Sequence, residues 1–120
     1  MKYVDLGRTG VRVSELCMGT MTFGAQADEE MSGKIFARCL DAGINHFDCA
    51  DIYADGRSEE ILGRLIKGKR DDLVIATKAY FATGDGPNDR GASRYHLVRA
   101  CEASLRRLGT DRVDLFYIHR

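Results

Sequence analysis

Short apolar runs alternate with amphipathic segments along the chain, and few folds accommodate that order. The apolar runs begin near residues 16, 44, 73 and 113, and a segment with helical features lies in each gap. Strands that alternate with helices at intervals of roughly 30 residues are typical of βαβ units, in which the strands run parallel. The runs are apolar nearly throughout, as expected for strands buried on both faces. The order therefore predicts an α/β domain with four parallel strands and three helices.

The helices are expected over residues 28–43, 58–68 and 93–109. Each contains apolar residues at helical spacing and ends at a glycine. Ser58 and Ser93 are the predicted N-caps of the second and third helices, because a serine oxygen can accept a hydrogen bond from a free N–H of the first turn.

A β-hairpin is predicted before the first parallel strand. Residues 1–13 contain the short β-prone stretches YVDL and VRV, separated by the glycine-bounded turn GRTG. No linker or low-complexity tract divides the remaining residues, 14–120, so we expect one α/β domain behind the hairpin.

The charge balance argues against several classes of function. The chain has 18 basic and 18 acidic residues and a net charge of zero, so it generates no long-range field that would attract nucleic acid or a membrane surface. Its uncharged apolar runs are only a few residues long, too short to span a bilayer. The start MKYVDLGRTG has no apolar signal segment, so a cytoplasmic location is expected.

The cysteines give no indication of a metal site or a disulfide scaffold. Cys17, Cys39, Cys49 and Cys101 are scattered and form no CxxC pair, so we expect reduced thiols that act mostly as small hydrophobic residues. No metal ligand set is predicted. A redox role for Cys49, which follows Asp48, stays open as a minor alternative.

Each predicted strand ends in residues able to bind a ligand or transfer a proton. The carboxyl ends of parallel strands lie on one side of the sheet, where ligands bind. We therefore expect the strand-end residues to face one mouth, together with a tyrosine from the loop after the second strand. The residues are Gly19, Thr20, Asp48, Tyr53, Lys78 and His119.

Taken singly, each of these residues has an ordinary structural explanation, such as a helix cap or a solvated lysine. Together, Asp48, Tyr53, Lys78 and His119 form a coherent proton-transfer set. A tyrosine with a reference pKa of about 10 is a proton donor near neutral pH, and a nearby ammonium group stabilises the phenolate left after donation. Such a set could protonate a carbonyl oxygen, but a nicotinamide would have to supply the hydride.

These segments resemble the aldo-keto reductase superfamily. FDCADIY, residues 47–53, resembles the family's Asp-x-Ala-x-x-Tyr pattern. VIATK and DLFYIHR resemble the segments with its catalytic lysine and histidine, and MGTMTFGAQ resembles its first barrel strand and cofactor loop. Three further segments resemble bacterial oxidoreductases related to voltage-gated potassium channel β subunits: LGRTGVRVSELCMGTMTFG, YADGRSEEILG and GASRYHLVRACEASLRRLGTDRVDL. The resemblance covers essentially all 120 residues.

The resemblance implies a (β/α)₈ barrel, the TIM barrel, plugged by the N-terminal hairpin. A complete barrel takes about 250 residues, whereas a doubly wound sheet of four strands would fit 120 residues more easily. We therefore expect the N-terminal half of a barrel, with strands one to four in residues 14–120 and the C-terminal half absent.

The resemblance also implies residue roles and a cofactor. NADPH is expected, bound without a glycine fingerprint, and the sequence has no GxGxxG segment after any strand. Tyr53 would be the general acid, Lys78 and Asp48 its tuning pair, and His119 the group that orients the carbonyl. The expected cofactor contacts are Gly19, Thr20, Met21, Gln26 and Asp48, and Tyr80 and Phe81 would line the substrate.

Two hypotheses stay open for the activity. In the first, the chain is a half-length reductase that converts aldehydes or ketones to alcohols. In the second, it is an inactive half barrel or assembly module that retains the four residues. A channel-associated or redox regulator is a weaker third. Half a barrel would expose sheet edges and inner-face residues, so we expect self-association, or pairing with a complementary half barrel.

Overall fold

The computed structural model describes residues 1–120 and contains two sheets and three α-helices. The N-terminal hairpin pairs β1 (Tyr3–Asp5) with β2 (Arg12–Ser14) in antiparallel fashion. The main sheet contains β3 (Met18–Gly19), β4 (His46–Asp48), β5 (Val74–Ala79) and β6 (Leu115–Ile118), all parallel. The predicted hairpin and four parallel strands are confirmed.

The helices alternate with these strands as the sequence predicts. They are α1 (Glu29–Asp41), α2 (Arg57–Ile66) and α3 (Arg94–Leu108). Two short 3₁₀ turns, η1 (Tyr53–Gly56) and η2 (Arg70–Asp72), flank α2. Ser93 caps α3 by accepting a hydrogen bond from the backbone N–H of His96, as expected.

The predicted N-cap of α2 is wrong. Gly56 occupies the cap position in a left-handed conformation and supplies no side-chain bond. Three consecutive positive φ angles, at Ala54, Asp55 and Gly56, turn the chain sharply into the helix. The N-cap therefore lies two residues earlier than predicted, and Ser58 lies inside the helix with its hydroxyl free to bond elsewhere.

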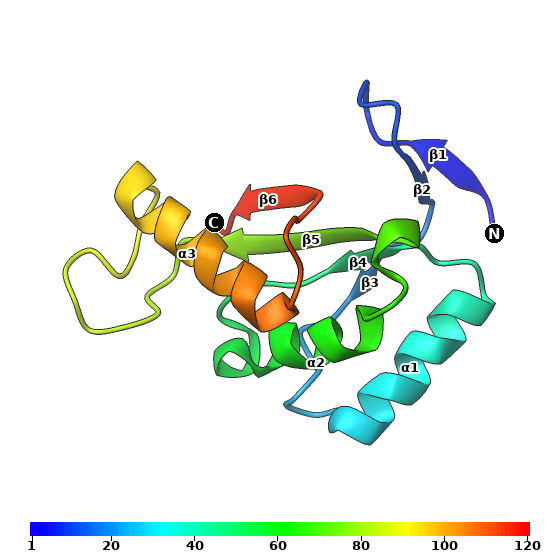
Figure 1. The fold of residues 1–120 in the computed structure, drawn as a ribbon, viewed down its shortest axis with the longest axis horizontal. Coiled ribbons are helices and arrows are strands. Elements are labelled where there is room, and N and C mark those ends of the chain that lie inside the picture. The colour runs from blue at the N-terminus through cyan, green and yellow to red at the C-terminus, as the bar shows by residue number, and fades with distance from the viewer.

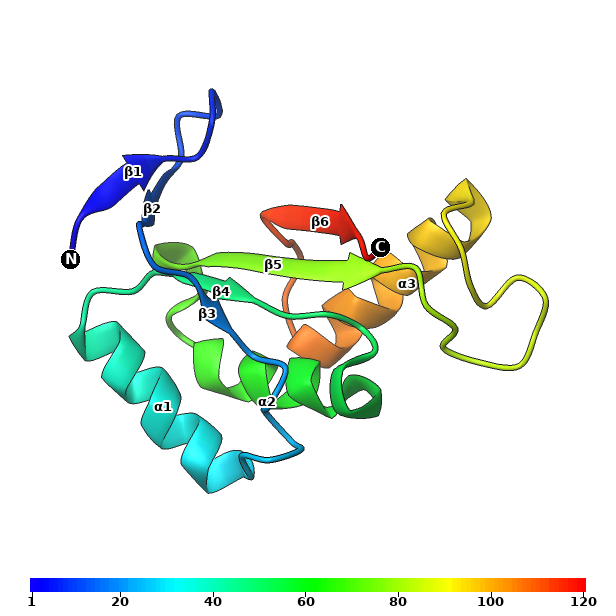
Figure 2. The same ribbon diagram turned by 180° about the vertical axis from the view of Figure 1, so that it is seen from behind.

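The order of the main sheet selects the barrel topology over the doubly wound one. Its strands neighbour each other in chain order, β3-β4-β5-β6, and Figures 1 and 2 show all three helices along one side of the sheet. A doubly wound sheet reverses its strand order and has helices on both faces. Sequential parallel strands with helices outside are the arrangement of a (β/α)₈ barrel wall.

The core lies between the sheet and the helices. Phe47 of β4 and Phe36 of α1 meet with ring centroids 4.8 Å apart. Leu62 of α2 and Ile75 of β5 are fully buried in the same cluster, and Leu108, the last residue of α3, is fully buried there as well. No helix is both long and apolar enough to cross a membrane.

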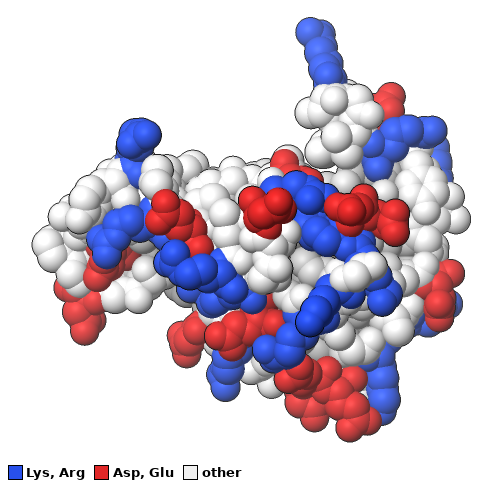
Figure 3. Space-filling view, in the orientation of Figure 1, with Lys and Arg blue, Asp and Glu red and all other residues white.

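Burial along the strands is uneven, contrary to the expectation that all are covered on both faces. β5 is buried along most of its length, whereas Tyr117 and Ile118 of β6 are 42% and 49% exposed. Charged side chains are spread over the face shown in Figure 3, with both signs interspersed.

Candidate active site

Four polar residues predicted from the strand ends meet at the carboxyl edge of the sheet. Asp48 is the last residue of β4, Lys78 lies near the end of β5, and His119 directly follows β6. Tyr53 opens the 3₁₀ turn after β4. The parallel pairing of β4, β5 and β6 aligns their ends, which is why residues far apart in sequence lie close together here.

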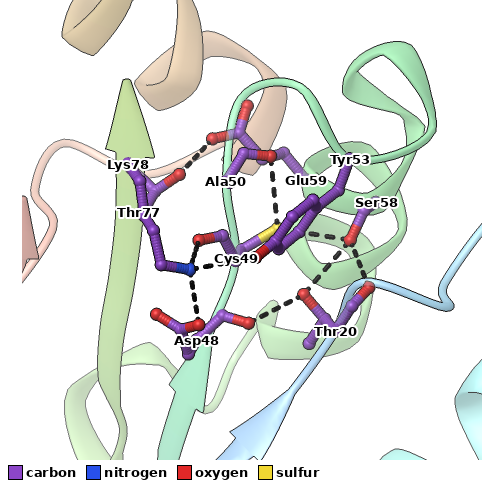
Figure 4. A network of polar contacts seen from close by, with 9 residues as sticks. All are labelled: Thr20, Asp48, Cys49, Ala50, Tyr53, Ser58, Glu59, Thr77 and Lys78. Carbon is purple, nitrogen blue, oxygen red and sulfur yellow. Dashed lines mark hydrogen bonds and ion pairs between the residues drawn. The ribbon is translucent and has the colours of Figure 1, made fainter. Parts of the chain in front are cut away.

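The Lys78 ammonium group is the centre of the site (Figure 4). Its Nζ donates to Asp48 Oδ2 at 2.5 Å, to the Cys49 carbonyl oxygen at 2.7 Å and to the Tyr53 hydroxyl at 3.3 Å. Burial by itself lowers the pKa of Lys78, but the hydrogen bonds to Asp48 and Tyr53 outweigh it and the net pKa is raised. The lysine is therefore a fixed cation beside the phenol.

The imidazole of His119 packs against two aromatic rings. It meets the Tyr53 ring edge-on at 5.6 Å between centroids and the Phe81 ring at 5.1 Å. Burial, and then the nearby Lys78 cation, lower the pKa of His119. Its Nδ1 is buried and has no hydrogen-bond partner. The His119 residue lines a cavity, where a neutral imidazole can bind a polar group of a substrate.

A cavity of about 620 Å³ opens beside these residues. Gly19, Asp48, Lys78 and His119 form part of its wall. This volume falls within the range of about 300–1,000 Å³ that is usual for small-molecule sites. The arrangement can thus hold a small ligand next to a cation, a carboxylate and an imidazole.

The structure brings only some of the predicted cofactor residues together. Gly19 lines the cavity, whereas Thr20 is fully buried and its hydroxyl donates to the Asp48 carbonyl oxygen at 3.1 Å. Met21 is 64% exposed. Gln26 lies apart from the cavity, at a separate depression near the start of α1.

The two predicted substrate residues lie at the end of β5. Phe81 is exposed and packs against His119, so it borders the site. Tyr80 contacts Phe81 edge-on, and its hydroxyl accepts a hydrogen bond from Arg120. Neither aromatic residue lines the cavity itself.

Sequence reasoning missed several buried polar contacts around the site. Cys49 is completely buried rather than accessible, and its carbonyl oxygen accepts from Lys78. Ser58, expected to cap α2, instead bonds to Thr20. Glu59 is fully buried and accepts from Thr77 at 2.5 Å and from Arg107 at 2.6 Å. An SEE run at the start of a helix usually indicates a solvated first turn, so only the fold reveals these contacts.

All four cysteines are free thiols, as predicted, although Cys17 is exposed. The described residues contain no group of three or more histidine, cysteine, aspartate or glutamate side chains placed to hold a metal ion.

Comparison with known proteins connects this geometry to a family. The pattern described as "Aldo/keto reductase family" matches residues 15–120. The chain belongs to the aldo-keto reductase family. A solved structure titled "aldo-keto reductase AKR11C1 from Bacillus halodurans (holo form)" superposes with a TM-score of 0.84 at 37% identity, over 97% of this chain and 39% of that one. The four parallel strands and three outer helices of this chain thus match part of the TIM barrel of that family.

Curated relatives in plants and bacteria are about equally similar. Two proteins named "Probable voltage-gated potassium channel subunit beta" are 46% identical in Oryza sativa and 47% identical in Arabidopsis thaliana, each over 100% of the chain. The "Uncharacterized oxidoreductase YrpG" of Bacillus subtilis is 45% identical over 99% of the chain. The chain spans only 38% of the length of each plant relative and 40% of the bacterial one.

Proposed function

We propose that this chain carries the catalytic residues of an NADPH-dependent reductase that converts aldehydes or ketones to alcohols. The observation that supports this proposal is the Lys78 ammonium group, which lines a cavity together with Asp48 and donates to both the Asp48 carboxylate and the Tyr53 hydroxyl. Tyr53 does not line this cavity itself and borders it through Lys78. A lysine confined in this way places a permanent positive charge 3.3 Å from a phenol oxygen.

In this proposal, Tyr53 is the general acid that donates its proton to the carbonyl oxygen. The positive charge of Lys78 stabilises the phenolate that forms. Asp48 holds Lys78 in place and compensates its charge. His119, whose pKa is lowered by burial and then by Lys78, lines the cavity as a neutral imidazole and orients the carbonyl group. A bound nicotinamide supplies the hydride, which no side chain can give.

The residues present fit the nicotinamide end of the cofactor. Gly19 has open space around its missing Cβ, with no atom within 4 Å, so backbone and ligand can approach each other closely. Met21 is exposed and follows Thr20 in the segment after β3, so its side chain is free to cover a bound ring. We assign Gly19, Met21 and Asp48 to direct contact with the nicotinamide. Thr20 supports Asp48 instead, because its hydroxyl already donates to the Asp48 carbonyl oxygen and accepts from Ser58. Gln26 stays a candidate for a more distant part of the cofactor.

Tyr80 and Phe81 are proposed to border an apolar part of the substrate. Phe81 presents an exposed ring next to His119, which fits a small carbonyl compound with an aliphatic or aromatic substituent. The carbonyl oxygen would then lie toward His119 and Tyr53, whose rings are in edge contact.

The test of the acid is Tyr53→Phe. We expect this variant to lose reductase turnover in any active assembly while NADPH affinity changes little, because only the hydroxyl is removed. Tyr95→Phe is the matched control, since Tyr95 is an exposed tyrosine on α3 that stacks with Arg99 away from the site. Turnover retained in Tyr53→Phe would rule out Tyr53 as the acid.

A calorimetric titration of the chain with NADPH separates the two hypotheses for its activity. Micromolar affinity would support a reductase site formed by this chain or its assemblies. No binding at millimolar cofactor would favour the inactive half-barrel hypothesis. Self-association stays a prediction, and light scattering on the same sample tests it; a clean monomer would contradict it.

A further inference from the structure

Three buried side chains form a polar chain directly behind Lys78. Thr20 follows β3, Cys49 follows β4, and Ser58 lies in the first turn of α2; none has exposed surface. Ser58 Oγ lies 2.7 Å from the Thr20 carbonyl oxygen, 3.1 Å from Thr20 Oγ1 and 3.2 Å from Cys49 Sγ. Figure 4 shows these contacts beneath the Tyr53 ring. We call Thr20, Cys49 and Ser58 the buried triplet.

The direction of each hydrogen bond in the buried triplet follows from counting protons. A serine hydroxyl has one proton, and the carbonyl oxygen of Thr20 can only accept, so Ser58 donates toward Thr20. Ser58 is then the acceptor in its contact with the Cys49 thiol, which lies 3.2 Å away, closer than the 3.8 Å that separates the thiol from its other acceptor, the Ala50 carbonyl oxygen. Burial raises the pKa of Cys49, so the thiol keeps the proton that this direction requires. Thr20 in turn donates its hydroxyl proton to the carbonyl oxygen of Asp48.

The buried triplet includes Cys49 and binds the backbone of Asp48, and these are two of the three residues that supply acceptors to Lys78. Asp48 gives Lys78 its carboxylate, while its backbone carbonyl accepts from the N–H and the hydroxyl of Thr20. Cys49 gives Lys78 its carbonyl oxygen, while its thiol bonds to Ser58. Asp48 and Cys49 therefore each use one group to bind within the triplet and another to bind the Lys78 ammonium group. Ser58 is the member that contacts both other residues, Thr20 after β3 and Cys49 after β4.

We propose that Ser58 is a positioning residue of the site, which holds Asp48 and Cys49 in the arrangement that fixes the Lys78 ammonium group beside Tyr53. The catalytic meaning of this role rests on the proposed reductase function. The positioning itself is a property of the chain without cofactor or substrate, so it is measured independently of activity.

The same fold contains a serine that isolates this role from simple stability. Ser32 of α1 is also fully buried, and its hydroxyl donates to the backbone carbonyl of Ala27 at 3.2 Å. Ser32→Ala and Ser58→Ala each remove one buried hydroxyl that donates to a backbone carbonyl. Only Ser58 is connected to the residues that bind Lys78.

The experiment follows the titration of Lys78 by NMR in protein labelled with ¹³C at lysine Cε, with Lys78→Met used to assign the resonance. We expect Ser58→Ala to lower the pKa of Lys78 by about half a unit, because the burial penalty stays while the acceptors loosen. The rate at which acetic anhydride acylates Lys78 gives a second measurement, because only the neutral amine reacts. At a pH below the lysine titration, lowering the pKa by half a unit raises the fraction of neutral amine, and with it this rate, about threefold. Ser32→Ala should leave both quantities as in the parent protein.

Two substitutions at Cys49 supply a rescue test and cover the case in which Ser58→Ala does not fold. Cys49→Ser keeps a donor for Ser58 and should leave the Lys78 titration near that of the parent. Cys49→Ala removes the donor and should shift it in the same direction as Ser58→Ala. An unshifted Lys78 in Ser58→Ala and Cys49→Ala would overturn the proposal. A shifted Lys78 in a chain that shows no turnover would refute the reductase function and leave the positioning role intact.

Discussion

The imidazole ring of His119 meets the phenol ring of Tyr53 edge-on, with ring centroids 5.6 Å apart and planes at 89°. The Lys78 ammonium nitrogen lies 5.0 Å from the centre of the same phenol ring. Tyr53 is therefore in contact with one permanent cation and with one imidazole whose pKa that cation lowers. Two positive charges around one phenol would repel each other, so the site favours a single one, on Lys78.

The first prediction concerns the charge of His119. Lys78→Met should raise the pKa of His119, because the variant removes a cation that lowers it and leaves the Asp48 carboxylate, which raises it. NMR titration of the imidazole resonances measures the change. Lys34→Met is the control, since Lys34 is an exposed lysine paired with Glu30 on α1. A His119 titration that stays in place or moves down would show that Lys78 does not set its charge.

The second prediction concerns the buried ion pair of Glu59 and Arg107, which joins α2 to α3. Glu59 is completely buried, so Arg107→Met should leave an uncompensated charge and lower the free energy of unfolding by about 3 kcal/mol near neutral pH. The double variant Glu59→Gln with Arg107→Met should recover part of this loss, since the charge is gone. Urea unfolding measures all three proteins.

The control for this pair is Arg64→Met, which breaks the exposed pair between Arg64 and Glu29. Exposed pairs are screened by solvent, so its effect should be much smaller. Equal losses in Arg64→Met and Arg107→Met would contradict the view that burial of Glu59 makes the second pair important.

The sequence predicts the architecture well because its signals are local. Helical spacing, a serine before α3 and apolar runs are each contained in a few residues, and the elements they predict are present. The convergence of Asp48, Lys78 and His119 follows from one geometric rule, that parallel strands end on one side. These parts of the site need no knowledge of side-chain packing.

The supporting contacts could not be predicted because they depend on tertiary geometry. Ser58 has the sequence context of a helix cap, but the left-handed turn over Ala54–Gly56 makes the helix begin nearer the N-terminus. Ser58 therefore lies inside α2, and its hydroxyl donates to Thr20, the residue after β3. Cys49 stands next to a polar residue, yet it is buried because α2 covers the end of β4. Only the positions of neighbouring elements distinguish these outcomes.

The third prediction concerns the close contact of α2 with α3 at Gly63. A Cβ on Gly63 would lie 2.6 Å from the backbone oxygen of Leu108 and 2.8 Å from that of Arg107. Backbone cannot yield as a side chain can, so Gly63→Ala should lower the free energy of unfolding by at least about 2 kcal/mol. Thermal or urea unfolding measures this loss.

Gly33→Ala on α1 provides a control with the opposite sign. The nearest atom to its added Cβ is Leu65 Cδ2, at 3.7 Å, an ordinary contact distance. Alanine is favoured over glycine inside a helix by about 0.5–1 kcal/mol, so this variant should be more stable than the parent. Similar effects at Gly63 and Gly33 would show that the helices adjust without cost.

The fourth prediction concerns the pH dependence of stability caused by Asp51. Its side chain is 4% exposed, and neither carboxylate oxygen has a hydrogen-bond partner. Burial, and then the negative charge of Glu59, raise the pKa of Asp51 from 3.8 to about 6, although Arg107 and His96 act in the other direction. Between these two values the folded protein binds more protons at Asp51 than the unfolded chain, so this contribution to stability is lost as the pH rises.

Asp51→Asn should therefore be more stable than the parent protein at pH 7 to 8, by no more than about 3 kcal/mol, which corresponds to the full shift in pKa. The difference should shrink through the range from pH 6 to pH 4, because Asp51 becomes neutral in the parent and the two side chains then carry the same charge. Unfolding in urea at several pH values measures this convergence. Asp85→Asn, which removes an exposed charge from the loop before α3 at a residue without a positive φ, reports the effect of net charge alone. A stability difference for Asp51→Asn that stays constant from pH 4 to pH 8 would show that the carboxylate is not the destabilising group.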